Sequence, residues 1–428
     1  MEANPLRPTF NYNLEALRGV AALTVAWHHA IYHPHHLDPG YVPTGVVAFN
    51  PPGHLAVLIF FLLSGYVIGR RYPRPLRGIE IGDYLHRRLV RVYPMYVLAV
   101  LAGVVVSGFT ISWRMVGYHL LFWQSWGEPV MFENNPLWSL QYEVLYYLAF
   151  IPLAVLALRP WVVVALAAVA GAGVLLLAPD GWHGALAQYL IGLVFWALGW
   201  ALAARRIEGS SVSWPRVVSA MLLLLSLEQL NPLTALLGEL NAWMGAHQIT
   251  FNQGWEAPAY AFNTSWGLDY GFLPYAACIV LQVAGVGGRG MRGLAVVLQL
   301  LPLCGVWQAS QHWQPEYTIP CVLYGASLLF FFGPSAALAV ASRHAVQRLV
   351  PLGAISYGIY IIHFPILFLM GKVMWFSGTA LTFGVRGGLY LLATLLVATW
   401  LDKVFQPWAR QWLGPTPTTP ALVAEARP

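Results

Sequence analysis

The sequence predicts an all-α fold, a polytopic bundle of about 10–12 transmembrane helices with both termini in the cytoplasm. Of its 428 residues, 58% are hydrophobic and only 9% are charged, whereas a soluble domain carries about 25% charged residues. Apolar runs of about 17–24 residues recur along the chain, which is the length that a helix needs to cross a bilayer. Basic residues also concentrate in alternate loops. We therefore expect one membrane domain over residues 1–413.

The apolar runs place the expected spans in order along the chain. They lie near residues 14–32, 54–70, 92–110, 137–158, 161–178, 185–204, 215–230, 271–287, 294–309, 318–340, 352–372 and 385–404. The stretch 231–270 is expected to form a long outer loop rich in Asn, Gln, Trp and Tyr. Such side chains suit a sugar ligand and equally an aromatic belt at the membrane surface. The Pro/Thr-rich tail 414–428 is expected to be disordered.

The formal net charge of +6 indicates membrane topology rather than a nucleic-acid partner. Arginine and lysine crowd the cytoplasmic loops of membrane proteins, and here they recur in every second loop. Arg114, Lys372 and Arg386 are exceptions to this pattern. The residues that follow it are Arg70, Arg71, Arg74, Arg77, Arg87, Arg88, Arg91, Arg159, Arg205, Arg206, Arg216, Arg289, Arg292, Arg343, Arg348, Lys403 and Arg410.

Ionisable side chains at membrane depth are costly and point to function. Arg18 and His29 are eleven residues apart, so they share one face of the first span at a separation of about 16 Å. Glu143 enters the fourth span from outside and reaches a depth similar to that of His29. A carboxylate beside an imidazole raises its basicity, so we predict that Glu143 supports His29 as a general base. The alternative is an interior arginine and an interfacial histidine without a catalytic role.

Two further groups carry weaker signals. Arg88 and Arg91 are three residues apart at the cytoplasmic rim, where guanidinium groups bind phosphates or simply anchor the helix. His363 shares a helix with Tyr357 and Tyr360, which suggests either a hydrogen-bonded structural cluster or a catalytic role. The histidines at 33, 35 and 36 have no carboxylate or thiolate at a fixed spacing, so no metal site is predicted.

Five segments together resemble acyltransferase family 3, the integral membrane O-acyltransferases of bacterial surface and secreted glycans. Any one of these segments is a weak signal, but five in the same order are specific. Glu15 departs from the family pattern, which usually has Asp there, and residues 160–350 carry little of the resemblance. The matching segments are NLEALRGVAALTVAWHH with Arg18 and His29, FFLLSGYVIGRR with Ser64, RRLVRVYPMY with Arg88 and Arg91, PLWSLQYEVLYYL with Trp138, Ser139 and Glu143, and ISYGIYIIHFP with Ser356, Tyr357, Tyr360 and His363.

The resemblance implies a multi-pass protein of the bacterial inner membrane. It would transfer an acyl group, expected to be acetyl, from cytoplasmic acyl-CoA to a hydroxyl of an extracytoplasmic acceptor, expected to be a carbohydrate. His29 and Glu143 would be catalytic, and Arg88, Arg91 and Arg18 would bind the donor. Supporting roles fall to Ser64, Trp138, Ser139, Tyr357, Tyr360 and His363.

Several points stay open at this stage. Direct transfer and a relay through an acyl-histidine both fit, and Ser139, Tyr360 and His363 are equal candidates for the oxyanion donor. A transporter or flippase for a polar lipid or glycan is the alternative function, because it would also carry buried charges, although no internal repeat supports it. The sequence does not determine the acceptor, the acyl chain length or the oligomeric state.

Overall fold

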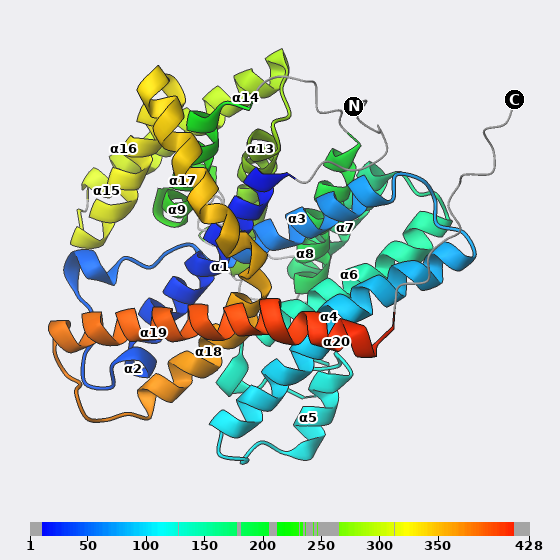
Figure 1. Cartoon of the computed structure of the whole chain (residues 1–428). Helices are drawn as coiled ribbons and strands as arrows, with labels where there is room; N and C mark the ends of the chain where they lie inside the picture. The colour runs from blue at the N-terminus through cyan, green and yellow to red at the C-terminus, as the bar shows by residue number, and fades with distance from the viewer. Residues whose placement is uncertain are drawn as a thin grey trace, which may run out of the picture.

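The computed structural model describes residues 11–126, 128–177, 181–204, 212–230, 265–311 and 313–414, and single positions between 232 and 246. Over these residues the chain folds into helices and contains no strand (Figure 1), which confirms the all-α prediction. The outer loop expected over 231–270 lies largely outside the described residues, and so does the tail beyond Gly414. The expectations for both segments therefore stay predictions.

The helices follow one another through short connections. The α-helices are α1 (Tyr12–Tyr32), α2 (Pro34–Leu37), α3 (Gly53–Arg71), α4 (Ile79–Val106), α5 (Trp113–Leu120), α6 (Leu137–Val155), α7 (Pro160–Leu177), α8 (Gly181–Ala203), α9 (Trp214–Leu230), α12 (Ser265–Leu268), α13 (Leu273–Ala284), α14 (Arg289–Leu300), α15 (Pro302–Gln311), α16 (Thr318–Phe332), α17 (Ala336–Ala354), α18 (Ser356–Gly371), α19 (Ala380–Trp400) and α20 (Gln406–Trp412). Short 3₁₀ turns lie at Gly45–Ala48, Phe132–Asn134, Asp269–Phe272 and Pro315–Tyr317, and a π-helical turn at Leu401–Phe405 joins α19 to α20.

Seven helical segments among the described residues are long and apolar enough to cross a membrane. The number is eight if α17 and α18, which are bent by 68° relative to one another, form one broken span. The chain is thus a helical, multi-pass membrane protein, as predicted. The remaining expected spans correspond to helices such as α1 and α6, which carry ionisable residues, and α9, which is 17 residues long.

Two of the predicted span boundaries are wrong. Helix α4 begins at Ile79 rather than near residue 92, so the arginines at 87, 88 and 91 lie on a helix instead of in a loop. The span expected over 318–340 is interrupted between α16 and α17. Pro334 lies in this break, and a proline cannot continue the helical hydrogen-bond ladder. The Ser335 side chain then caps the first turn of α17.

Helices α3 and α8 cross in backbone contact. A Cβ atom on Gly65 would lie 1.9 Å from the carbonyl oxygen of Trp196, and one on Gly199 would lie 2.0 Å from that of Leu62. Small residues allow this close approach of membrane helices. The crossing fixes the position of α3 and of Ser64, the residue next to Gly65.

Helix α1 runs through the middle of the bundle (Figure 1) and packs against α3, α17 and α18. Its crossing with α17 also depends on glycines. A Cβ on Gly353 would lie 2.0 Å from the carbonyl oxygen of Glu15, and one on Gly19 would lie 2.7 Å from the Leu352 side chain. The crossing places Arg18 beside the bend between α17 and α18.

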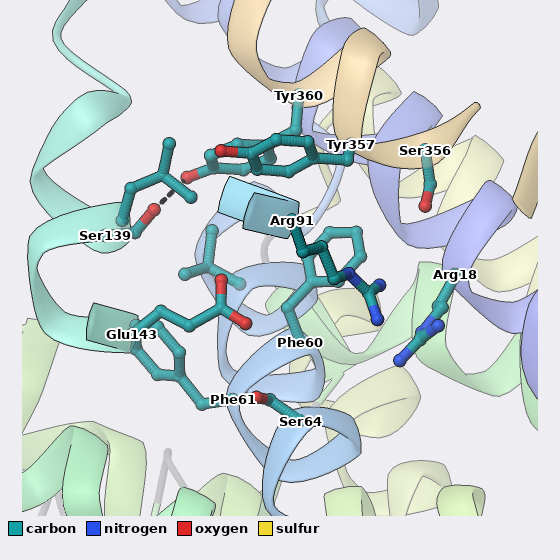
Figure 2. A pocket seen from close by; sticks show the side chains of 12 residues that line it. Arg18, Phe60, Phe61, Ser64, Arg91, Ser139, Glu143, Ser356, Tyr357 and Tyr360 are labelled. Carbon is teal, nitrogen blue, oxygen red and sulfur yellow. Dashed lines mark hydrogen bonds between the residues drawn. The ribbon is translucent and has the colours of Figure 1, made fainter. Parts of the chain in front are cut away.

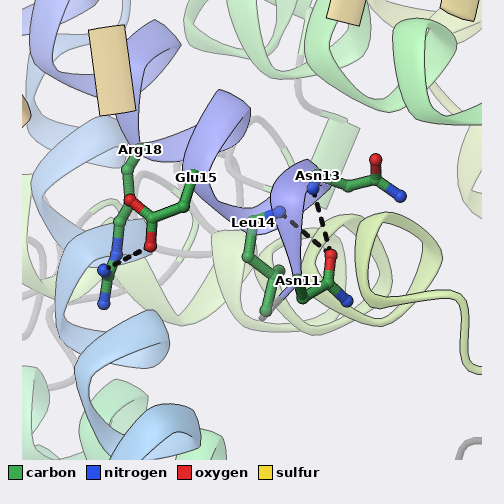
Figure 3. Close-up of polar contacts among 5 residues, drawn as sticks. All are labelled: Asn11, Asn13, Leu14, Glu15 and Arg18. Carbon is green, nitrogen blue, oxygen red and sulfur yellow. Dashed lines mark hydrogen bonds and ion pairs between the residues drawn. The ribbon is translucent and has the colours of Figure 1, made fainter. Parts of the chain in front are cut away.

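The first turn of α1 is capped by its own sequence (Figure 3). The Asn11 side chain accepts hydrogen bonds from the backbone N–H groups of Asn13 and Leu14 at 3.1 and 3.3 Å. The side-chain amides of Asn11 and Asn13 donate in turn to the last carbonyls of α13, both at 3.3 Å. One turn later, Glu15 forms an ion pair of 2.9 Å with Arg18. The start of α1 and the end of α13 therefore lie at the same end of the molecule.

A buried carboxylate joins α2 to α19 at the opposite end of α1. Asp38 accepts hydrogen bonds from the Thr382 hydroxyl at 2.6 Å, from the backbone N–H of Gly378 at 2.9 Å, and from the Ser377 hydroxyl. Burial by itself would raise the pKa of Asp38, but these hydrogen bonds lower it below its ordinary value. The carboxylate is therefore charged at neutral pH and holds the connection between α18 and α19 against α2.

The three basic residues that break the charge pattern are each engaged by the protein. Arg386 is 2% exposed and donates to backbone carbonyls of the two segments that it joins, residues 37 and 370. Lys372 donates to a carbonyl at the end of α4. Arg114 forms an ion pair of 2.9 Å with Glu128. Their positive charges thus serve local structure, and they do not contradict the topology that the other arginines indicate.

Candidate functional site

A cavity of about 570 Å³ lies in the centre of the bundle, among α1, α3, α4, α6 and α18. Figure 2 shows Glu143 entering it from α6 and Arg18 from α1 on the opposite side, with the α18 tyrosines above them. The cavity brings together side chains from all five segments that the sequence singled out. Its lining residues are Arg18, Val57, Phe60, Phe61, Ser64, Arg91, Ser139, Leu140, Glu143, Ser356, Tyr357 and Tyr360.

A second cavity, of about 810 Å³, adjoins the first. The two share Arg18, Arg91, Ser356 and Tyr357 as lining residues. The second cavity is otherwise bordered by polar groups of α1, η5 and α20: Glu15, Asp402, Gln406 and Arg410. A path therefore leads from the end of the molecule that holds the start of α1 to the central cavity, and Arg18 and Arg91 stand at the junction.

Glu143 is held in place by a chain of hydroxyl groups. The Tyr147 hydroxyl, one helical turn further along α6, donates a hydrogen bond to the carboxylate. The same hydroxyl accepts a hydrogen bond of 3.2 Å from Ser64 on α3. Among the described residues no basic side chain lies within 4 Å of Glu143. The carboxylate thus faces the cavity with part of its hydrogen-bonding capacity free.

The predicted phosphate-binding pair is divided between two environments. Arg91 lines both cavities and is exposed. The guanidinium of Arg88 lies 5.2 Å from the ring centre of Tyr147 and 5.7 Å from that of Tyr84, and it lines neither cavity. A cation over the ring faces stabilises both tyrosines in place. Arg88 therefore supports the tyrosine that holds Glu143, whereas Arg91 is the residue available to a ligand.

Two hydroxyl groups meet at the inner end of the central cavity. The Ser139 and Tyr360 oxygen atoms are 2.5 Å apart, and both lie within hydrogen-bond distance of the Pro136 carbonyl, at 3.1 and 3.2 Å. Each hydroxyl has one proton, so one of them donates to Pro136 and the other donates to its neighbour. A ligand oxygen placed between them would receive at least one of these protons.

His29 pairs with His363, not with Glu143. The His29 Nδ1 atom lies 3.0 Å from His363 Nε2 and 3.0 Å from the Val25 carbonyl oxygen, while His363 Nδ1 lies 3.1 Å from the Ile359 carbonyl oxygen. Each Nδ1 must carry a proton because its partner is a carbonyl oxygen. His363 Nε2 then accepts from His29, and the Nε2 atom of His29 keeps a free lone pair. The predicted contact between His29 and Glu143 is absent from the hydrogen bonds of both residues.

The histidine pair begins where the cavity ends. The Tyr360 ring, which lines the cavity, lies 5.9 Å from the ring of His363. Phe364 packs edge-on against His29 at 5.2 Å, and His33 stacks on the other side at 6.1 Å. His33 lies past the end of α1, where burial lowers its pKa to about 4, so it is uncharged at neutral pH. No cluster of metal-ligating residues occurs in the part of the chain that the structure describes.

The sequence gave no reason to select several residues of this region. Tyr147 lies four residues after Glu143, and the spacing of one helical turn is the only signal that could have identified it. His54 and Asp269 form an ion pair of 2.8 Å near Trp138, which stacks on His54 at 6.3 Å rather than lining the cavity. This pair joins residues 215 positions apart, and no sequence pattern announces it.

Comparison with known proteins gives two kinds of match. A family model described as an acyltransferase domain matches residues 11–403. The chain is also 32% identical over 149 residues to the acyltransferase MdmB of Streptomyces mycarofaciens, a match that covers 32% of this chain and 38% of that protein.

A second relative is protein 2 in the picA locus of Rhizobium radiobacter. It is 38% identical over 88 residues, which is 20% of this chain and 40% of the relative. The matches therefore span about two fifths of the length of each of these relatives. No solved structure matches the chain.

Proposed function

The chain belongs to the acyltransferase 3 family, and from this premise we propose that it transfers an acyl group, preferably acetyl, from cytoplasmic acyl-CoA to a hydroxyl of an extracytoplasmic carbohydrate. The observation that carries the proposal is the pair of adjoining cavities, which leads past Arg18 and Arg91 to the hydroxyls of Ser139 and Tyr360. A donor made on one side of the inner membrane can thus serve an acceptor on the other.

The outer cavity is the proposed site for the nucleotide part of the donor. Guanidinium groups bind phosphates with charge-assisted hydrogen bonds, and this cavity offers Arg18, Arg91 and Arg410. Arg18 is already paired with Glu15, which keeps its side chain pointed at the junction. The narrow pantetheine arm then extends into the central cavity.

Glu143 serves the donor rather than His29 in this proposal. Its carboxylate is fixed by Tyr147 and faces the central cavity. A carboxylate accepts hydrogen bonds from N–H groups, and the pantetheine arm carries two amides. The expected support of His29 by Glu143 is replaced by support from His363, which lies 3.0 Å from His29.

The reaction itself is a direct acyl transfer. His29 Nε2 takes the proton of the acceptor hydroxyl as the oxygen attacks the thioester carbonyl. The negative charge that develops on the carbonyl oxygen is stabilised by the hydroxyls of Ser139 and Tyr360. His363 is less suited to that task because both of its ring nitrogens already have partners. The C–S bond then breaks, the ester forms, and the thiolate leaves with the proton that His29 returns.

The test is acyl-CoA binding and consumption by the purified protein in nanodiscs. Radiolabelled acetyl-CoA is compared with longer acyl thioesters, and transfer to added oligosaccharides is followed. His29→Ala should bind the donor but lose turnover, whereas Arg91→Ala should lose affinity for the donor. Arg71→Ala is the matched control, because Arg71 is exposed at the end of α3 and lines neither cavity. A folded wild-type protein that neither binds nor consumes any acyl-CoA would contradict the proposal and favour a transporter.

A further inference from the structure

A third cavity lies away from the acyl-transfer path, at the ends of α9, α13 and α14. It has a volume of about 660 Å³. Because α13 ends where the Asn11 and Asn13 side chains bind its last carbonyls, this cavity lies at the same end of the molecule as the start of α1. The distribution of arginines predicts that this end faces the cytoplasm.

The polar part of this cavity is basic. Arg216 of α9 and Arg292 of α14 both line it, and Ser213 adds a hydroxyl. Neither arginine has a carboxylate within 4 Å among the described residues. The Arg216 guanidinium instead lies 5.4 Å from the ring centre of Phe331, which orients it without neutralising its charge. Two unpaired guanidinium groups at one cavity are the chemistry that binds a phosphate group.

A second polar group in the cavity lacks a partner. The Gln282 side-chain nitrogen donates to the sulfur of Cys278 at 3.0 Å, so its orientation is set. The opposite atom, Oε1, is buried and accepts no hydrogen bond from any described residue. A buried acceptor without a donor costs about 1–3 kcal/mol. A ligand that supplies a hydroxyl or ammonium donor beside its phosphate would remove this cost.

The remaining walls are apolar, and they continue onto a lipid-like surface. Val286, Met291 and Val296 line the cavity beside the arginines. On the adjoining helices, large apolar side chains are exposed, among them Val297 of α14 at 54% and Phe332 of α16 at 50%. In a membrane these faces contact acyl chains. The cavity is therefore open to a molecule that has an anionic head and a hydrocarbon tail.

We propose that this cavity binds an anionic phospholipid of the cytoplasmic leaflet, with its phosphate between Arg216 and Arg292 and a headgroup donor on Gln282 Oε1. Basic pockets between helices on the cytoplasmic side suit such headgroups. The site is separate from the acyl-transfer cavities, with which it shares no lining residue. It therefore does not depend on the reaction proposed above.

The experiment measures lipid binding by native mass spectrometry of the delipidated full-length protein. Phosphatidylglycerol is titrated against phosphatidylcholine, and inorganic phosphate and glycerol phosphate serve as soluble competitors. The variants are Arg216→Ala, Arg292→Ala, the double substitution and Gln282→Leu. Arg289→Ala is the matched control, because it removes the same charge three residues from Arg292 and does not line the cavity.

Wild type is expected to prefer phosphatidylglycerol, and each cavity arginine should contribute about tenfold to its affinity. Arg289→Ala should leave the affinity unchanged. Gln282→Leu should weaken phosphatidylglycerol but not phosphatidic acid, which has no headgroup donor beyond its phosphate. Equal binding of phosphatidylcholine, or an unchanged affinity in the folded double variant, would overturn the proposal. Displacement of the lipid by millimolar glycerol phosphate would assign the cavity to a soluble phosphate instead.

Discussion

The pairing of His29 with His363 leads to a prediction that separates orientation from catalysis. The perturbation is His363→Ala, which removes the acceptor for the His29 Nδ1 proton but leaves the base itself in place. A second variant, His363→Gln, offers a side-chain oxygen of similar reach to the same proton. His29→Ala removes the base altogether and sets the lower limit of activity.

The size of the effect follows from the contacts of His29. A neutral hydrogen bond is worth about 0.5–1.5 kcal/mol, which corresponds to roughly a 2- to 13-fold change in rate. The Nδ1 proton keeps its second partner, the Val25 carbonyl at 3.0 Å, so the productive tautomer is weakened but not lost. We therefore expect His363→Ala to lower kcat by up to about tenfold. His29→Ala should lower it by about 10²–10⁴, the usual contribution of a general base.

The assay follows release of the CoA thiol and formation of the acyl ester at saturating donor. His344→Ala is the matched control. His344 has the same type of bond to the carbonyl four residues earlier, at 2.9 Å, but lies exposed on α17. Its removal should leave kcat unchanged.

Two results would refute the reasoning. The first is a folded His363→Ala protein that works at the wild-type rate, because the histidine pair would then have no part in the reaction. The second is a His363→Gln protein no more active than His363→Ala, because that outcome would assign the loss to packing rather than to the hydrogen bond. A loss in His363→Ala as large as that in His29→Ala would instead make His363 a catalytic residue in its own right.

Other features of the structure predict smaller experiments. Arg91→Ala should raise KM for acyl-CoA about tenfold, as expected for one charge-assisted hydrogen bond, whereas Arg88→Ala should act mainly on kcat and thermal stability because it contacts Tyr147; equal KM values would contradict this division. Gly65→Ala should lower the thermal midpoint strongly, since its Cβ would lie 1.9 Å from a backbone oxygen of α8, while Gly290→Ala, which has open space around it, should not. Asp38→Asn should cost about 1.5–3 kcal/mol at neutral pH through the loss of a charge-assisted network. Because the pKa of Asp38 is lowered in the folded protein, this contribution is present above the unfolded pKa of about 4 and fades as the pH falls through the folded value. A pH-independent difference in stability between Asp38→Asn and wild type would contradict this.

Composition and apolar run length were sufficient for the fold class. A chain with 9% charged residues has no aqueous surface large enough for a soluble domain, and each apolar run satisfies its own backbone hydrogen bonds as a helix. These are local properties, so they can be recognised without tertiary information. Span boundaries were less predictable, because α4 continues through its arginines and α16 stops at a proline within an apolar run.

The residues of the candidate site were also largely visible in the sequence, because polar side chains in apolar runs are rare. Arg18, Ser139, Glu143 and Tyr360 were all selected in this way and line one cavity. Their partners were not visible. Whether Glu143 meets His29 depends on the rotation and depth of two helices that are more than a hundred residues apart in the chain.

The tertiary structure decided those partners through backbone crossings. The glycine contacts of α3 with α8 and of α1 with α17 fix where Ser64 and Arg18 lie. The bend of 68° between α17 and α18 brings His363 to His29 and leaves Glu143 with Tyr147. The sequence by itself thus determined which side chains are buried in the membrane domain. Only the packing of the helices determined which of them are close enough to form hydrogen bonds, because a hydrogen bond requires a separation of about 3 Å, and spacing along a single chain segment does not specify it.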